Sequence, residues 1–162
     1  MRLIGSGAIL REVIAAAELL HSDWGVASEI FSATSFSELA REARGVERYN
    51  RLHPGAAAQN QKSYLEQMLC AVPTIAATDY VRAYGELIAP HVRGRYVVLG
   101  TDGFGRSDTR AALRAFFEID RHQVVVAALA ELVRDGQIPH ETLQSALTRY
   151  RLDVDKPAPW TV

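Results

Sequence analysis

The stretch that decides the fold is Gly100-Thr101-Asp102-Gly103-Phe104-Gly105-Arg106-Ser107-Asp108-Thr109-Arg110. It follows the apolar run of residues 96–99 and precedes an amphipathic segment, so it is typical of a loop that leaves a buried strand and enters a helix. Its three glycines permit backbone conformations that other residues adopt only at a cost. Because open α/β sheets place their binding contacts beyond the carboxyl ends of the strands, we expect any functional surface at this loop.

Strands and helices alternate along the rest of the chain. The predicted strands are residues 2–4, 26–32, 74–77 and 96–99. The predicted helices are residues 8–20, 35–44, 63–69, 79–91, 108–117, 121–135 and 139–149. This alternation indicates crossover units, and therefore an α/β fold: a mostly parallel sheet with helices on both faces, in three αβα layers.

Polar residues and glycine mark the ends of several predicted helices. Ser35, with Glu38 three residues later, predicts a capping box. The other expected caps are Asp79, Asp108 and Asp120 at amino ends and Gly136 at a carboxyl end. Residues 45–61 have no periodicity and predict a long surface loop.

Length and composition describe one ordinary globular domain. The chain has 162 residues, 48% hydrophobic and 23% charged, with a net charge of −1. This balance gives no general attraction to nucleic acid or to an anionic membrane, and no apolar run approaches the roughly 18 residues of a membrane span. We expect a domain over residues 1–156 and an irregular tail over residues 157–162. Because the chain begins inside a strand, we expect it to be cut from a longer one.

The single cysteine, Cys70, cannot form an intrachain disulfide. It lies in an apolar run and is interpreted as a small buried hydrophobic residue. Together with the lack of a signal-peptide pattern, this favours a reducing, cytoplasmic setting.

Gly5-Ser6-Gly7 follows a strand and precedes a helix, which invites a dinucleotide-binding interpretation. The fingerprint fails at its third glycine, where Leu10 stands, and residues 33–35 supply no acid for a ribose. Tight packing of strand on helix explains these glycines adequately.

No residue pattern points to a reaction centre. Asp79 and Asp102 each follow a strand and could form a carboxylate pair, although capping of nearby N–H groups explains both. The chain has five histidines, and their spacing is not that of metal ligands. They are His21, His53, His91, His122 and His140. His53, in the expected long loop, is the most interesting but is best explained as an exposed residue. We therefore assign no catalytic, cofactor-binding or metal-binding residue to the chain.

The ordered set of segments nevertheless resembles a known family. The segments that carry the likeness are residues 3–13, 34–36, 38–41, 47–54, 77–80, 100–110 and 124–132. They are similar to the carboxyl-terminal domain of the homodimeric, thiamine-diphosphate-dependent decarboxylating component of bacterial pyruvate dehydrogenase. The Gly-Thr-Asp-Gly-Phe-Gly-Arg-Ser-Asp run is the most specific of them.

The resemblance implies a fold of the transketolase carboxyl-terminal type, with a five-stranded, largely parallel sheet. It also implies that thiamine diphosphate and magnesium are bound by two preceding domains, and that the acetyl group passes to the lipoyl-bearing acyltransferase component. Thr101-Asp102-Gly103 differs from the family's Gly-Asp-Gly diphosphate motif at its first position, and no Asn-Asn pair follows. We expect no cofactor in this chain and no catalysis by it alone.

What the resemblance leaves for this domain is a supporting role in subunit packing and dimer formation. The candidate interface residues are Thr101, Asp102, Gly103, Phe104, Gly105, Arg106, Ser107 and Asp108. The expected partners are the preceding domains of the same chain, a second subunit and the acyltransferase component. An alternative is a stand-alone small α/β protein that binds a nucleotide or phosphate at Gly5-Ser6-Gly7 or Gly103-Phe104-Gly105.

Overall fold

A parallel sheet forms the centre of the molecule. The computed structural model describes residues 1–54, 61–69 and 71–162. Its strands are β1 (Arg2–Gly5), β2 (Glu29–Ser32), β3 (Thr74–Ala77) and β4 (Tyr96–Leu99). They lie in the order β2-β1-β3-β4, and each neighbouring pair is parallel. The four predicted strands are thus confirmed, with β2 three residues shorter at its start.

The expectation of a fifth strand is wrong, because the sheet that the described residues form has four strands. Only the family resemblance suggested the fifth. After β4 the described residues form the helices α5 (Arg110–Phe116), α6 (Arg121–Arg134) and α7 (His140–Arg149). The β-branched start of α6 does not make it a strand, since fourteen residues bounded by an Asp120 cap favour a helix.

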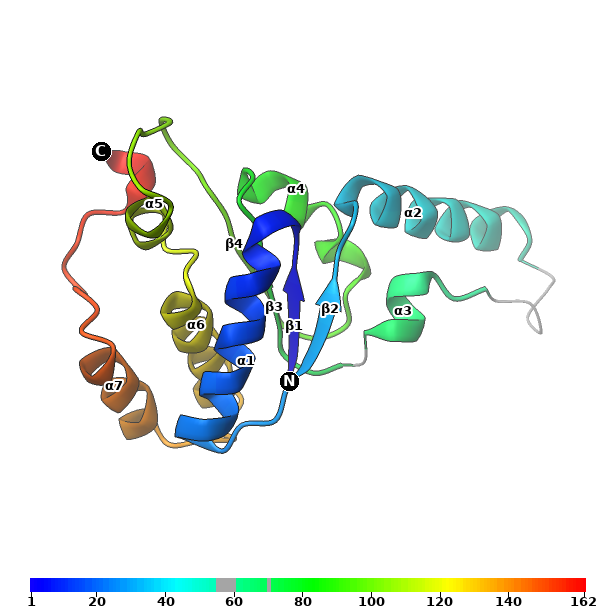
Figure 1. The fold of residues 1–162 in the computed structure, drawn as a ribbon. Helices are drawn as coiled ribbons and strands as arrows, with labels where there is room; N and C mark the ends of the chain where they lie inside the picture. The colour runs from blue at the N-terminus through cyan, green and yellow to red at the C-terminus, as the bar shows by residue number, and fades with distance from the viewer. Residues whose placement is uncertain (55–60, 70) are drawn as a thin grey trace.

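Helices cover both faces of the sheet (Figure 1), as the three-layer prediction requires. One face packs against α1 (Leu10–Trp24), which follows the 3-10 turn η1 (Gly7–Ile9), and against α6, while α7 packs on α6. The other face packs against α2 (Phe36–Leu52), α3 (Tyr64–Met68) and the segment of α4 (Arg82–Glu86) and the 3-10 turn η3 (Ala89–His91).

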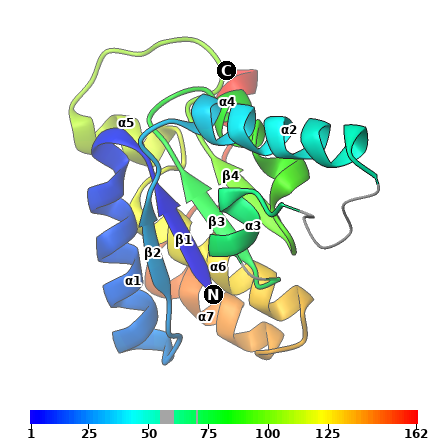
Figure 2. The ribbon, with the colours of Figure 1, turned by 90° about the vertical axis from the view of Figure 1, so that its right-hand side faces the viewer.

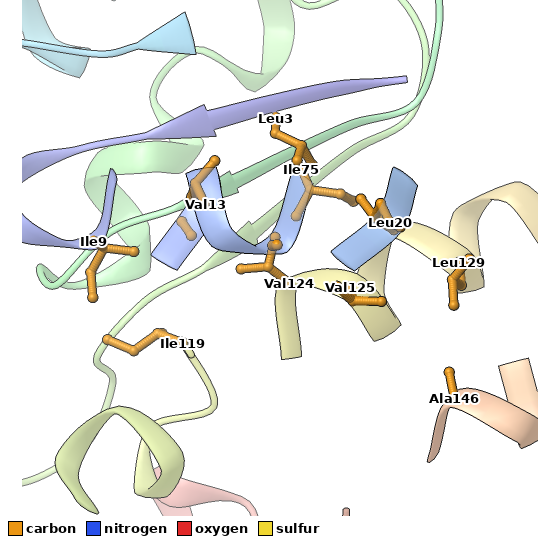
Figure 3. Packing of buried hydrophobic residues seen from close by; sticks show 13 residues of the cluster. Leu3, Ile9, Val13, Leu20, Ile75, Ile119, Val124, Val125, Leu129 and Ala146 are labelled. Carbon is orange, nitrogen blue, oxygen red and sulfur yellow. The ribbon is translucent and has the colours of Figure 1, made fainter. Parts of the chain in front are cut away.

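Alternation along the central strands sends side chains into two separate cores. Leu3 and Ile75 face α1 and α6, where they pack with Leu20 and Val124 (Figure 3). The next residue on β1, Ile4, faces α2 and α3 instead. Successive strand residues point to opposite faces, so a parallel sheet buried on both sides needs continuous apolar runs.

The expected boundary between the helix at residues 35–44 and the long loop that follows it is wrong. Helix α2 continues eight residues past its predicted end and takes up the first part of the expected long loop. Gly45 lies inside this helix, and a single glycine weakens a helix without ending it. Residues 55–60 of that loop, and Cys70, lie outside the described residues.

The helix caps and the carboxyl-terminal tail match the sequence predictions only in part. Ser35 Oγ accepts from the Glu38 N–H at 3.2 Å, which is one half of the predicted capping box, because the Glu38 carboxylate pairs with Arg41 instead of returning to Ser35. Asp120 accepts from the N–H groups of His122 and Gln123, as predicted. Gly136 has the expected left-handed backbone, with φ of 67°. The tail, expected to be irregular, contains the 3-10 turn η4 (Pro159–Thr161). Within the described residues, none of the helices is long and apolar enough to cross a membrane.

Candidate functional site

The glycine-rich loop runs from the end of β4 to the start of α5. Figure 2 shows it arching beyond the carboxyl ends of the strands, where the sequence placed it. The carboxyl terminus of the chain lies beside the loop, because the turn η4 near that terminus packs against Gly103. An added Cβ at Gly103 would lie 2.9 Å from the Pro159 carbonyl oxygen, and its φ of 100° also favours glycine.

The first residues of the loop are held tightly to the segment after β3. Asp102 accepts from the Arg82 backbone N–H at 3.0 Å and from Arg82 Nε at 2.5 Å. The Thr101 N–H donates to the Tyr80 carbonyl at 2.9 Å, and its hydroxyl donates to the Asp79 carbonyl at 3.2 Å. The base of the loop is therefore rigidly placed by two long-range attachments.

Asp102 rather than Asp79 supplies the carboxylate at the start of α4. The prediction that Asp79 caps a helix is wrong: α4 begins after Val81, which makes no side-chain cap. Asp79 Oδ1 instead lies beside Gly7, 2.9 Å from the position of an added Cβ there. The imagined pair of free carboxylates does not form, because Asp102 is committed to Arg82.

The distal half of the loop is exposed to solvent. Phe104 is 83% exposed, while Arg106 places its guanidinium 4.9 Å from the centre of the Phe116 ring. Gly105, Ser107 and Asp108 are exposed. Asp108 was expected to cap α5, but Thr109 does so, with its hydroxyl accepting from the Ala112 N–H at 3.3 Å.

A cavity of about 480 Å³ lies beneath this loop. Its apolar lining comes from Ile9, Leu113, Phe117 and Ile119 together with Ala8. Its charged lining consists of Asp79, Arg106, Arg110 and Arg114. The turn η1, the end of β3 and the loop therefore meet around one hollow at the carboxyl edge of the sheet.

Sequence reasoning missed the buried charge cluster beside this cavity. The Glu12 side chain is 7% exposed and is held by Arg114 Nη1 at 2.8 Å and by Arg121 Nε at 2.9 Å. Burial would raise the pKa of Glu12, but the hydrogen bonds and charge of Arg121, with the charge of Arg114, lower it below its usual value. One feature of the sequence could have revealed the cluster. Glu12 lies three residues after Ile9 and four before Ala16, which places an acid on the apolar face of a helix.

The Gly5-Ser6-Gly7 turn has a packing explanation, as the sequence suggested. An added Cβ at Gly5 would lie 2.6 Å from Leu10 Cα, so only glycine lets β1 and the start of α1 come this close. Leu10 is also the residue that stands where the dinucleotide fingerprint needs its third glycine.

The described residues offer no cluster of ligands for the magnesium ion that accompanies thiamine diphosphate. No group of three or more His, Cys, Asp or Glu side chains among them could hold a metal ion. The nearest counterpart of a metal-binding aspartate, Asp102, is engaged by Arg82. His53 stacks on Tyr49 with ring centres 4.1 Å apart, and its Nδ1 lies 2.8 Å from the Tyr49 carbonyl oxygen. It directly follows α2 and lies away from the glycine-rich loop.

Comparison with known proteins gives consistent matches along the chain. Residues 1–120 match the family model described as transketolase-like TK C-terminal domain. The chain is 52% identical over its whole length to the pyruvate dehydrogenase E1 component of Cupriavidus necator and covers 18% of that protein. It is 48% identical over 96% of its length to the E1 component of Haemophilus influenzae and 45% identical over 98% to that of Escherichia coli K12, again covering 18% of each.

A solved structure supports the fold alone. The "Split gene transketolase, inactive beta4 tetramer" superimposes with a TM-score of 0.54 at 15% identity, covering 82% of this chain and 39% of that one. The chain therefore spans less than a fifth of the length of these E1 relatives, and less than half of the transketolase chain.

Proposed function

This chain belongs to the family of transketolase-like TK C-terminal domains, and from that premise we propose that it is the carboxyl-terminal domain of a pyruvate dehydrogenase E1 component. In this role it supports subunit packing in a cytoplasmic homodimer. The similarity to E1 components over the whole chain favours this role over that of a stand-alone nucleotide-binding protein.

The exposure of Phe104 carries the proposal. A phenylalanine that is 83% exposed leaves most of an apolar ring in water, although the loop that bears it is anchored at its base. Large aromatic side chains held on rigid supports are characteristic of the energetically dominant residues of protein interfaces. The loop from Thr101 to Asp108 therefore contacts the preceding domains of its own chain and the second subunit.

Further exposed aromatic residues lie at the same edge of the molecule. Tyr80 is 58% and Trp160 53% exposed, and Tyr84 packs against Tyr80 with ring centres 4.8 Å apart. Arg82 links them to the loop, since it binds Asp102 and lies 4.8 Å from the Trp160 ring. Exposed apolar groups gathered at one place mark interaction surfaces, so the contact extends beyond the loop.

The chemistry of the complete enzyme resides in its other domains. There the enzyme decarboxylates pyruvate on thiamine diphosphate, with magnesium, and acetylates the lipoyl group of the acyltransferase component. Within the described residues, Asp102 does not suit the magnesium of that cofactor, because it is already paired with Arg82. The role proposed for this chain is therefore structural.

Replacing Phe104 with alanine in the full-length polypeptide tests the contact. We expect the dissociation constant of the dimer to rise at least about tenfold, because truncating an aromatic residue that dominates an interface costs about 2 kcal/mol or more. Sedimentation over a range of concentrations measures it. Leu52→Ala is the matched control, since Leu52 is a 54% exposed apolar residue at the end of α2. Equal dissociation constants for Phe104→Ala and the unaltered enzyme would reject the role of the loop.

A further inference from the structure

The cavity beneath the loop combines an apolar wall with an excess of positive charge. Ile9 and Ile119, which lie at one end of the core (Figure 3), contribute to its apolar wall with Leu113 and Phe117. Its volume of about 480 Å³ falls within the range that small-molecule sites occupy. An apolar wall with a few convergent charged groups is the usual composition of such sites.

Two of the three arginines in the lining are held in place. Arg114 is fixed by the buried carboxylate of Glu12 at 2.8 Å, and its own side chain is only 17% exposed. Arg106 stacks on Phe116, as noted above. Because the guanidinium of Arg106 is already oriented, an anion that binds it requires little additional ordering.

The positive charge around the cavity is only partly neutralised. Glu12 is shared between Arg114 and Arg121, so one carboxylate serves two guanidinium groups. Within residues 1–54, 61–69 and 71–162, neither Arg106 nor Arg110 forms an ion pair with a carboxylate. A guanidinium presents several N–H donors in a plane that suits a carboxylate or phosphate group.

We infer that this cavity binds a small organic monoanion with an apolar body. The charged group lies against Arg106 and Arg110, and the apolar body lies against Ile9, Ile119 and their neighbours. Asp79, the acid in the lining, restricts the net charge of the ligand, because it repels a second negative charge. The loop residues Thr101, Gly103, Gly105 and Arg106 also line this cavity, whereas Phe104, the residue that carries the proposed dimer contact, does not.

Benzoate and its neutral counterpart benzamide test this inference on the full-length polypeptide. The readout is the shift of the isoleucine methyl signals in NMR spectra, with Ile9→Val and Ile119→Val identifying the two signals from the cavity. We expect benzoate to shift both signals and to leave that of the exposed Ile30 in place. Benzamide and inorganic phosphate, which lack the charge and the apolar body respectively, bind at least about fivefold more weakly.

Charge substitutions locate the anion. Arg106→Gln and Arg110→Gln each weaken benzoate binding about fivefold, whereas Asp79→Asn strengthens it. Arg48→Gln, at an exposed position on α2, leaves the binding unchanged. Absence of the benzoate shifts, equal binding of benzamide, or indifference to both arginine substitutions would each overturn the inference. Loss of the dimer in Phe104→Ala with intact benzoate binding would separate the two sites.

Discussion

At the scale of single residues, the carboxylate of Glu12 joins parts of the chain that are distant in sequence. Its two arginine partners, Arg114 and Arg121, lie 102 and 109 residues further along. Arg121 donates from its backbone N–H as well, so Glu12 also fixes the start of α6. Removing one member of such a buried cluster leaves the remaining charges without their partner, which costs more than losing an exposed ion pair.

Glu12→Gln should lower the free energy of unfolding by about 2 kcal/mol at pH 7, because charged hydrogen bonds to a buried carboxylate are lost. The folded pKa of Glu12 lies below its usual value of 4.5, so this stabilisation is complete above pH 4.5 and is lost as the pH falls through the folded pKa. Urea denaturation at several pH values measures both effects. The difference between the two proteins should narrow below pH 4.5.

Glu18→Gln provides the control for that prediction. Glu18 is an exposed glutamate on the same helix and forms no ion pair within the described residues. Its substitution should change the unfolding free energy by less than about 0.5 kcal/mol. A Glu12→Gln protein as stable as Glu18→Gln at pH 7 would show that the cluster contributes no net stabilisation.

At the scale of elements, Asp102 places the loop and α4 relative to one another. It belongs to the segment after β4 but binds the first residue of α4, which follows β3. These strands are parallel neighbours, so their carboxyl ends meet at the same edge and their connecting segments lie in contact. The carboxylate therefore takes the place of a cap that Val81 cannot provide.

Asp102→Ala should release this attachment. We expect amide hydrogen exchange at Arg82 and Thr101 to become at least about fivefold faster, since the loss of a capping carboxylate costs about 1 kcal/mol or more. Exchange measured by mass spectrometry of short peptides detects the change. Asp155→Ala, in the exposed tail, should leave both amides as protected as before. Unaltered protection in Asp102→Ala would mean that the backbone bond from Thr101 to Tyr80 suffices.

At the scale of the whole molecule, β1 holds the two cores together. It pairs with β2 on one side and with β3 on the other, and Leu3 and Ile4 enter opposite cores. Its last residue, Gly5, lies where the chain turns into η1 and α1. The close contact with Leu10 there sets the distance between the sheet and one of its helical layers.

Gly5→Ala should therefore destabilise the whole domain. The added methyl group meets the Leu10 backbone, which cannot move without shifting α1, and such overpacking typically costs about 1–3 kcal/mol. Gly105→Ala is the matched control, because nothing lies within 4 Å of an added Cβ at Gly105. Chemical denaturation compares the two. Equal stability of both variants would show that the strand-to-helix contact tolerates a larger residue.

Sequence patterns correctly predicted those helix caps and ends that depend only on residues close together in the chain. Asp120 caps α6 because the N–H groups it satisfies are two and three residues away. Asp79 and Asp108 stand before helices in the same way, yet neither is the cap, since the path of each loop places the start of its helix elsewhere. Gly45 suggested the end of a helix that in fact continues to Leu52, because an isolated glycine only weakens a helix.

By itself the sequence determined the α/β class, the four strands, most of the helices and the position of the glycine-rich loop beyond the sheet. These features follow from apolar periodicity and from residues that act within a few positions of one another. Only the tertiary structure decided the strand order, the partner of Asp102, the burial of Glu12 and the cavity beneath the loop. Each of these depends on groups that lie twenty to more than a hundred residues apart and meet only when the layers pack.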